Sequence, residues 1–205
     1  YSPLFYNDIK KFSAKGGEGM KKRKLFCEIS PLCYKISKKK EQILHDVKDA
    51  FKNDVFSEEK NKTPLPFVVK RHSSKIVREL YGVDTELQEN KRTNLRIAGE
   101  KINGIIINPG ETFSFWKLVG EPSEKNGYLD GLVIQGGNLK SGTGGGLCQL
   151  ANLIHWLILH SPLEVTELHH HSDALFPDSG RRVPFGTGTS ISYRNLDYRF
   201  KNTTD

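Results

Sequence analysis

Residues 142–159 read Gly-Thr-Gly-Gly-Gly-Leu-Cys-Gln-Leu-Ala-Asn-Leu-Ile-His-Trp-Leu-Ile-Leu. The glycines predict a loop, and the apolar run after them predicts a helix from Cys148 to about His160, roughly 20 Å long at 1.5 Å per residue. Because its side chains leave little polar surface, we expect this helix to be buried in the core.

The cysteine at the start of this helix is the first candidate for chemistry. The helix dipole and the unpaired amides of the first turn favour the thiolate of Cys148, the form that acts as a nucleophile or metal ligand. Gly144, Gly145 and Gly146 allow a substrate backbone to approach closely. An inert, buried cysteine behind a glycine turn is the alternative interpretation.

Short strand-like segments surround this helix in the sequence. They are bounded by turn signals and comprise residues 105–107, 112–118, 127–134, 165–171, 189–193 and 198–200. One helical pattern follows a cap at Ser37 and covers residues 37–51, a second covers residues 74–80, and residues 90–95 lead into a third helix near Ala98 that ends at Asn103-Gly104. The sequence therefore predicts an α+β fold, a mixed domain of short strands around a buried helix that begins at Cys148, with a helical N-terminal region.

The positive charge lies at one end of the chain. The net charge is +7, yet residues 1–40 hold eleven Lys/Arg and three Asp/Glu, so the remainder is close to neutral. We expect residues 1–19 to be a non-native or disordered leader before Met20, residues 20–93 to be a basic, mainly helical region, and residues 94–205 to be the core domain. Because no nucleic-acid motif accompanies the charge, a solvated surface is favoured over nucleic-acid binding.

Cysteine usage and hydropathy suggest a compartment. Three cysteines, Cys27, Cys33 and Cys148, favour free thiols in a reducing environment. No apolar run approaches the ~18 residues of a transmembrane helix. We therefore expect a cytoplasmic protein, with the basic N-terminal region as a possible attachment to a membrane surface. The oligomeric state is left open.

A histidine cluster follows the helix. His169 and His171 would share one face of a strand, and either can serve as the general base for Cys148, oriented by Asp173 or Glu167. The Gln149 side chain and the loop amides can stabilise an oxyanion. Arg199 can hold a carboxylate or phosphate, although an ordinary salt bridge is the simpler role.

The same groups suit a metal. Cys148, His169, His171 and Asp173 are acceptable zinc ligands. The chain lacks a close-spaced cysteine pair and a His-Glu-x-x-His helix, so a site without cofactor is preferred and zinc is the alternative.

Several segments, in order, resemble the VanW family. They are Asn94-Leu95-Arg96-Ile97-Ala98, Pro109-Gly110-Glu111-Thr112-Phe113-Ser114-Phe115, Gly127-Tyr128, Gly144-Gly145-Gly146-Leu147-Cys148-Gln149, Glu167-x-His-x-His-Ser and Asp197-Tyr198-Arg199-Phe200-Lys201-Asn202. The resemblance covers roughly residues 20–205. Where the wider family tends to have Ser-Thr-Thr after Cys-Gln, this chain has Leu150-Ala151-Asn152.

The resemblance implies a role in the cell wall and in glycopeptide (vancomycin) resistance. It brings no established reaction. Together with the residues it suggests a cysteine-dependent acyl transferase or amide hydrolase on a cell-wall peptide or precursor, with Ser172 placed among the substrate-binding residues. A non-catalytic module that binds peptidoglycan or its precursors is the alternative.

Overall fold

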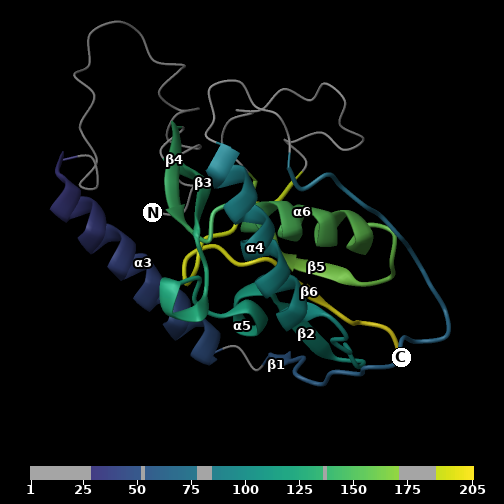
Figure 1. Cartoon of the computed structure of the whole chain (residues 1–205). Coiled ribbons are helices and arrows are strands. Elements are labelled where there is room, and N and C mark those ends of the chain that lie inside the picture. The colour runs from purple at the N-terminus through teal and green to yellow at the C-terminus, as the bar shows by residue number, and fades with distance from the viewer. Residues whose placement is uncertain (1–28, 52–53, 78–84, 136–137, 171–187) are drawn as a thin grey trace, which may run out of the picture. The chain divides into compact units, whose positions relative to one another are not determined.

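The computed structural model describes residues 29–51, 54–77, 85–135, 138–170 and 188–205 (Figure 1). The chain divides into two compact units, Tyr1–Asn53 and Asp54–Asp205. The second unit begins earlier in the chain than the predicted core domain, because residues from Asp54 onward already contribute a strand to its sheet. The predicted leader, residues 1–19, lies outside the described residues.

The described part of the first unit is the helix α3 (Pro31–Phe51). It starts before the predicted cap at Ser37, because the Ser30 hydroxyl accepts a hydrogen bond from the Cys33 amide at 3.2 Å. Proline directly after such a cap is favourable, since its missing N–H has no partner in the first turn.

A four-stranded sheet forms the frame of the second unit. Its order is β1 (Val55–Phe56), β2 (Glu111–Ser114), β6 (Arg199–Lys201) and β5 (Glu164–Glu167). β1 and β2 are parallel, and the other two pairs are antiparallel. A separate antiparallel hairpin consists of β3 (Asp130–Gln135) and β4 (Asn138–Thr143).

The helices complete the unit. They are α4 (Thr85–Ile102), α5 (Phe115–Val119), α6 (Leu147–Ile158) and a short 3-10 helix at Glu124–Asn126. α4 contacts the hairpin strand β3 and both other α-helices (Figure 1). Helices together with mixed sheets confirm the predicted α+β class.

The core joins the sheet to α6. Phe113 on β2 and Phe200 on β6 are paired in register, and their rings stack with centroids 4.4 Å apart. Burying each such ring stabilises the fold by ~2–3 kcal/mol. α6 contributes one buried face rather than its whole circumference, namely Leu147, Ala151, His155 and Ile158.

Some predicted elements are wrong in extent. The strand predicted over 112–118 ends at Ser114, because the Ser114 hydroxyl caps α5 by accepting from the Lys117 amide at 3.2 Å. The segments 105–107 and 189–193 contribute only single bridges, Lys60–Ile105 and Ser192–Leu196. Residues 74–77, the described part of the predicted helix 74–80, are not helical, and β5 ends at Glu167 instead of continuing to His171.

Candidate functional site

The register of three neighbouring strands brings polar side chains together. Ser114 on β2 and Glu167 on β5 both pair with Arg199 on β6. The pairing of β5 with β6 shifts between Val165 and Glu167, so Glu167 rather than Thr166 lies opposite Arg199. This irregularity aims a carboxylate at the guanidinium.

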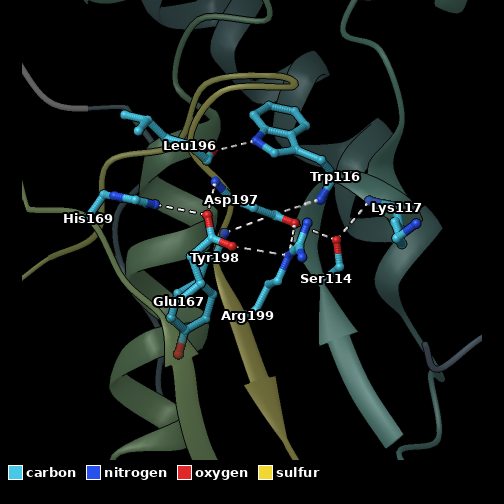
Figure 2. A network of polar contacts seen from close by, with 9 residues as sticks. All are labelled: Ser114, Trp116, Lys117, Glu167, His169, Leu196, Asp197, Tyr198 and Arg199. Atoms are coloured by element: carbon cyan, nitrogen blue, oxygen red, sulfur yellow. Dashed lines mark hydrogen bonds and ion pairs between the residues drawn. The ribbon is translucent and has the colours of Figure 1, made fainter. Parts of the chain in front are cut away.

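We call Ser114, Glu167, His169, Asp197 and Arg199 the Arg199 network (Figure 2). The Arg199 Nε atom lies 2.8 Å from Asp197 Oδ2 and 3.3 Å from Glu167 Oε2. The Arg199 and Asp197 side chains are only 3% and 1% exposed. A guanidinium held this deeply between two carboxylates is a structural ion pair.

Asp197 organises the surrounding backbone as well. Its carboxylate accepts hydrogen bonds from the Ser114 hydroxyl, the Trp116 amide at 3.1 Å and the Tyr198 amide at 2.8 Å. The Trp116 indole donates to the Leu196 carbonyl at 2.8 Å (Figure 2). The carboxylate thus joins the end of β2, the start of α5 and the start of β6.

Glu167 links this network to a histidine. Its Oε1 atom accepts from His169 Nε2 at 2.9 Å and from the Asp197 amide at 3.0 Å. The structure therefore brings together Glu167 and His169, one of the predicted pairs of carboxylate and base. A carboxylate in this position fixes the ring and stabilises the imidazolium that forms when the ring accepts a proton.

Cys148 is the second residue of α6 and is half-buried. Its sulfur lies 3.8 Å from the Ile191 carbonyl oxygen, to which the thiol donates. Burial raises the pKa of the Cys148 thiol, and the backbone of Ile191 and Cys148 offsets this only in part. Burial thus opposes the thiolate that the helix start was expected to favour.

The segment 190–191 contacts both candidate residues. The Ser190 amide donates to the His169 carbonyl, and the next residue, Ile191, contacts the Cys148 sulfur. Cys148 and His169 are therefore anchored to adjacent residues of one segment.

The glycine loop is packed closely. Gly144 and Gly145 are buried. A Cβ atom on Gly145 would lie 2.1 Å from the carbonyl carbon of Gly131, so only glycine lets the two backbones meet. The Asn94 side chain donates to the Gly145 carbonyl at 3.0 Å and to the Leu129 carbonyl at 2.9 Å. These contacts give the glycines a structural role, and their role in binding substrate stays a prediction.

Gln149 is already engaged. Its side chain donates to the Lys75 carbonyl at 2.8 Å, and its amide donates to the Gly146 carbonyl at 2.9 Å. The same side-chain amide also contacts the Ser74 hydroxyl at 3.4 Å, so it can donate to an oxyanion as predicted only if one of these two side-chain contacts is released.

Three predicted site residues, His171, Ser172 and Asp173, lie outside the described residues. Within the described ranges no group of three or more His, Cys, Asp or Glu residues is arranged to hold a metal ion. Two ligands of the zinc alternative, His171 and Asp173, are therefore not placed, and that alternative stays a hypothesis.

Sequence reasoning missed several buried polar residues. Asp197 and Asn94 lie in the segments that carry the family resemblance, which was the available signal, but no role was assigned to them. His155 lies within the apolar run of α6, and its Nδ1 atom lies 3.0 Å from the Tyr198 hydroxyl. Burial, followed by the charge of His170, lowers the pKa of His155, and burial raises that of Tyr198.

In the part of the chain that the structure describes, none of the helices combines the length and hydrophobicity needed to span a bilayer.

The fold and the site define an α+β domain with a buried charge network in its sheet. Residues 90–205 match the family described as VanW like protein, and the chain belongs to this VanW family.

Two curated relatives are similar to the chain. The Vancomycin B-type resistance protein VanW of Enterococcus faecalis is 37% identical over 141 residues, which cover 69% of this chain and 51% of the relative. The Uncharacterized protein YoaR of Bacillus subtilis is 27% identical over 114 residues, covering 56% of this chain and 36% of the relative. The chain thus spans about half the length of the first relative and about a third of the length of the second. No solved structure matches it significantly.

Proposed function

We propose that this chain acts in vancomycin B-type resistance, the process in the name of its Enterococcus faecalis relative. Family membership supports this role. The chemistry proposed is acyl transfer or amide hydrolysis on a cell-wall peptide or its precursor, with Cys148 as the nucleophile.

The reaction proceeds through a thioester. The Cys148 sulfur attacks the amide carbonyl carbon while the thiol proton passes to His169. The carbon–nitrogen bond then breaks, and the amine leaves with the proton from the imidazolium. Water or an acceptor amine next attacks the thioester, transferring a proton through the same histidine, and the thiol regains a proton as the acyl group leaves.

The hydrogen bond between Glu167 and His169 carries this proposal. Because burial disfavours the Cys148 thiolate, the attack needs a base, and an imidazole held by a carboxylate is well suited to that task. His169 and Cys148 are also both held by the segment 190–191. His171 with Asp173 is the competing pair.

A non-catalytic module that binds peptidoglycan or its precursors is the second candidate. The raised pKa of the Cys148 thiol and the engaged Gln149 side chain favour it. In that case ligand binding survives Cys148→Ala and no turnover occurs.

Alkylation of Cys148 across the pH range in which histidine and cysteine titrate tests the base. A Cys27→Ser, Cys33→Ser background isolates the thiol, and intact mass measures its reaction with iodoacetamide. We expect His169→Ala to slow alkylation around neutral pH, and the matched control His170→Ala to leave it unchanged. If His171→Ala has the effect instead, the competing pair is correct.

Incubation with muropeptides tests turnover. If the chain is an enzyme, we expect mass spectrometry to show an acyl adduct on Cys148, and we expect amine to be released. Both products should be absent in Cys148→Ala. Binding without either product supports the second candidate. Stoichiometric zinc that is lost in Cys148→Ser would replace both mechanisms with the metal alternative.

A further inference from the structure

A loop of the second unit exposes a run of apolar side chains. We call residues 62–71 the apolar loop, and every residue in it is exposed. Phe67 is 87% exposed, and Leu65, Val68 and Val69 are 62%, 59% and 69% exposed. Single exposed apolar residues are ordinary, but a contiguous group that includes an aromatic ring marks an interaction surface.

Both ends of the apolar loop are fixed to the body of the unit. Before it, the Asn61 amide donates to the Gly104 carbonyl at 2.8 Å, and Lys60 forms a bridge with Ile105. After it, the Gln149 side chain holds the Lys75 carbonyl, and the ring of His72 lies 6.1 Å from that of Trp156. The apolar residues therefore project from two anchored ends.

The composition of the loop keeps it extended. Pro64 and Pro66 have fixed φ angles and lack amide donors, so this stretch neither joins a helix nor completes a sheet ladder. The Thr63 amide donates to the Asn61 side chain at 3.0 Å, which closes a local turn at the start of the loop.

Close to the apolar residues the formal charges are positive, and the nearest acidic residues before them in the sequence are Glu58 and Glu59. Residues 60–77 contain five basic residues and no acidic residue. Two of the basic residues precede the apolar residues in the sequence and three follow them. They are Lys60, Lys62, Lys70, Arg71 and Lys75. A surface with both anionic groups and an apolar interior complements this pattern on both counts.

We propose that the apolar loop docks on an anionic lipid bilayer. Phe67 and its apolar neighbours enter the boundary between headgroups and acyl chains, and Lys70 and Arg71 contact lipid phosphates. This surface is distinct from the basic residues 1–40. It is also independent of the chemistry at Cys148, although Gln149 ties the base of the loop to the start of α6.

Vesicle co-sedimentation of the full chain tests the docking. The probes are phosphatidylcholine vesicles with and without phosphatidylglycerol. We expect binding to the mixed vesicles and a partition coefficient about tenfold lower in the Phe67→Ser, Val69→Ser double variant. The Lys70→Gln, Arg71→Gln double variant should have a partition coefficient lower by about fivefold for each charge removed. Added salt should weaken binding of the wild type, because it screens these charges.

Matched controls distinguish binding through the apolar loop from nonspecific adsorption and from the effect of charge elsewhere in the chain. Leu159 is 57% exposed, and Leu159→Ser should leave the partition coefficient unchanged. Lys125→Gln with Lys140→Gln removes two exposed charges outside the loop and should have a smaller effect than the loop pair. Since residues 1–40 are the same in every variant, their contribution cancels in these comparisons.

Two results overturn the proposal. One is equal partitioning of the wild type and the Phe67→Ser, Val69→Ser variant. The other is concentration-dependent self-association, seen by sedimentation without lipid, that the same two substitutions abolish, because this would make a second copy of the chain the occupant. Far-ultraviolet circular dichroism and the unfolding midpoint verify that each variant is folded.

Discussion

The Arg199 network and the start of α6 belong to the same unit but hold their polar groups in opposite ways. In the network, the Asp197 carboxylate accepts three hydrogen bonds in addition to its contact with Arg199. The Glu167 carboxylate accepts two hydrogen bonds in addition to its contact with Arg199. At the start of α6, the Cys148 thiol has one long contact to a carbonyl oxygen. The first region is fixed by many polar contacts, whereas the described residues hold the Cys148 thiol by one hydrogen bond and by packing against the core.

This difference separates residues that stabilise the fold from the residue that we propose as the nucleophile. Groups bonded on every side are costly to remove and unavailable for reaction. Among the described residues the thiol makes one weak hydrogen bond, so replacing it should cost less than removing a carboxylate of the network. The two regions meet at the segment 190–191, whose backbone contacts the His169 carbonyl and the Cys148 sulfur.

Removing Asp197 should have the largest effect. Asp197→Ala leaves the buried Arg199 guanidinium with one carboxylate fewer and deprives two amides and a hydroxyl of their acceptor. We expect a loss of about 3–5 kcal/mol in the free energy of unfolding, measured by chemical denaturation.

Glu100→Ala is the control for Asp197→Ala. It removes the exposed ion pair with Arg96 and should cost less than about 1 kcal/mol. Similar losses in the two variants would contradict the assignment of the network as the structural centre of the sheet.

Adding a methyl group to the glycine loop should have the next largest effect. Gly145→Ala forces its Cβ against the Gly131 backbone and should destabilise the fold by about 1–3 kcal/mol. Gly99 lies inside α4 with no atom within 4 Å of its added Cβ, so Gly99→Ala should stabilise by about 0.5–1 kcal/mol. Thermal or urea unfolding of the pair measures both, and equal signs would refute the packing role of the loop.

Cys148→Ala should cost much less than Asp197→Ala. The residue is half-buried and its sulfur makes one weak hydrogen bond among the described residues, so we expect a loss of about 1 kcal/mol. Urea unfolding of this variant beside Asp197→Ala tests the contrast between the two regions. A cost near that of Asp197→Ala would mean that the thiol is a structural group, and the case for a nucleophile would weaken.

The smallest effect concerns pH. Because burial lowers the pKa of His155, the unfolded chain takes up this proton first as the pH falls below about 6.5. Stability from His155 is therefore present above that pH and lost as acidity increases. In His155→Gln, the slope of unfolding free energy against pH below 6.5 should be shallower by at most about 1.4 kcal/mol per pH unit, and identical slopes would argue against a buried neutral imidazole.

Local signals predicted α6 and the end of α4, but they missed the start of α4, the helix α5 and the strand β4. The apolar spacing of α6 and the Asn103-Gly104 stop of α4 belong to single segments, so the sequence reveals them. β4 carries Lys140, Ser141 and two-sided exposure, and only its pairing with β3 makes it a strand. The strand predicted through residue 118 failed because the hydroxyl of Ser114 caps a helix there, a choice that aromatic alternation does not indicate.

For the candidate site, the sequence offered candidate residues but not the contacts around them. Cys148, Glu167 and His169 are residue types associated with catalysis and attract attention in any sequence. Asp197 and Ser114 act through their positions across a sheet, 83 residues apart in the chain. The raised pKa of Cys148 likewise depends on what covers the thiol, which the glycine motif does not encode.

The irregular pairing in β5 has different consequences for a substitution and for a deletion at residue 166. Thr166 is exposed and has no register partner on β6, so many side chains fit at this position. Deleting it would restore regular pairing between β5 and β6. Position 166 should therefore tolerate substitution, and deletion of Thr166 should leave Glu167 opposite Arg199 while removing the extra local twist that a bulge gives its strand.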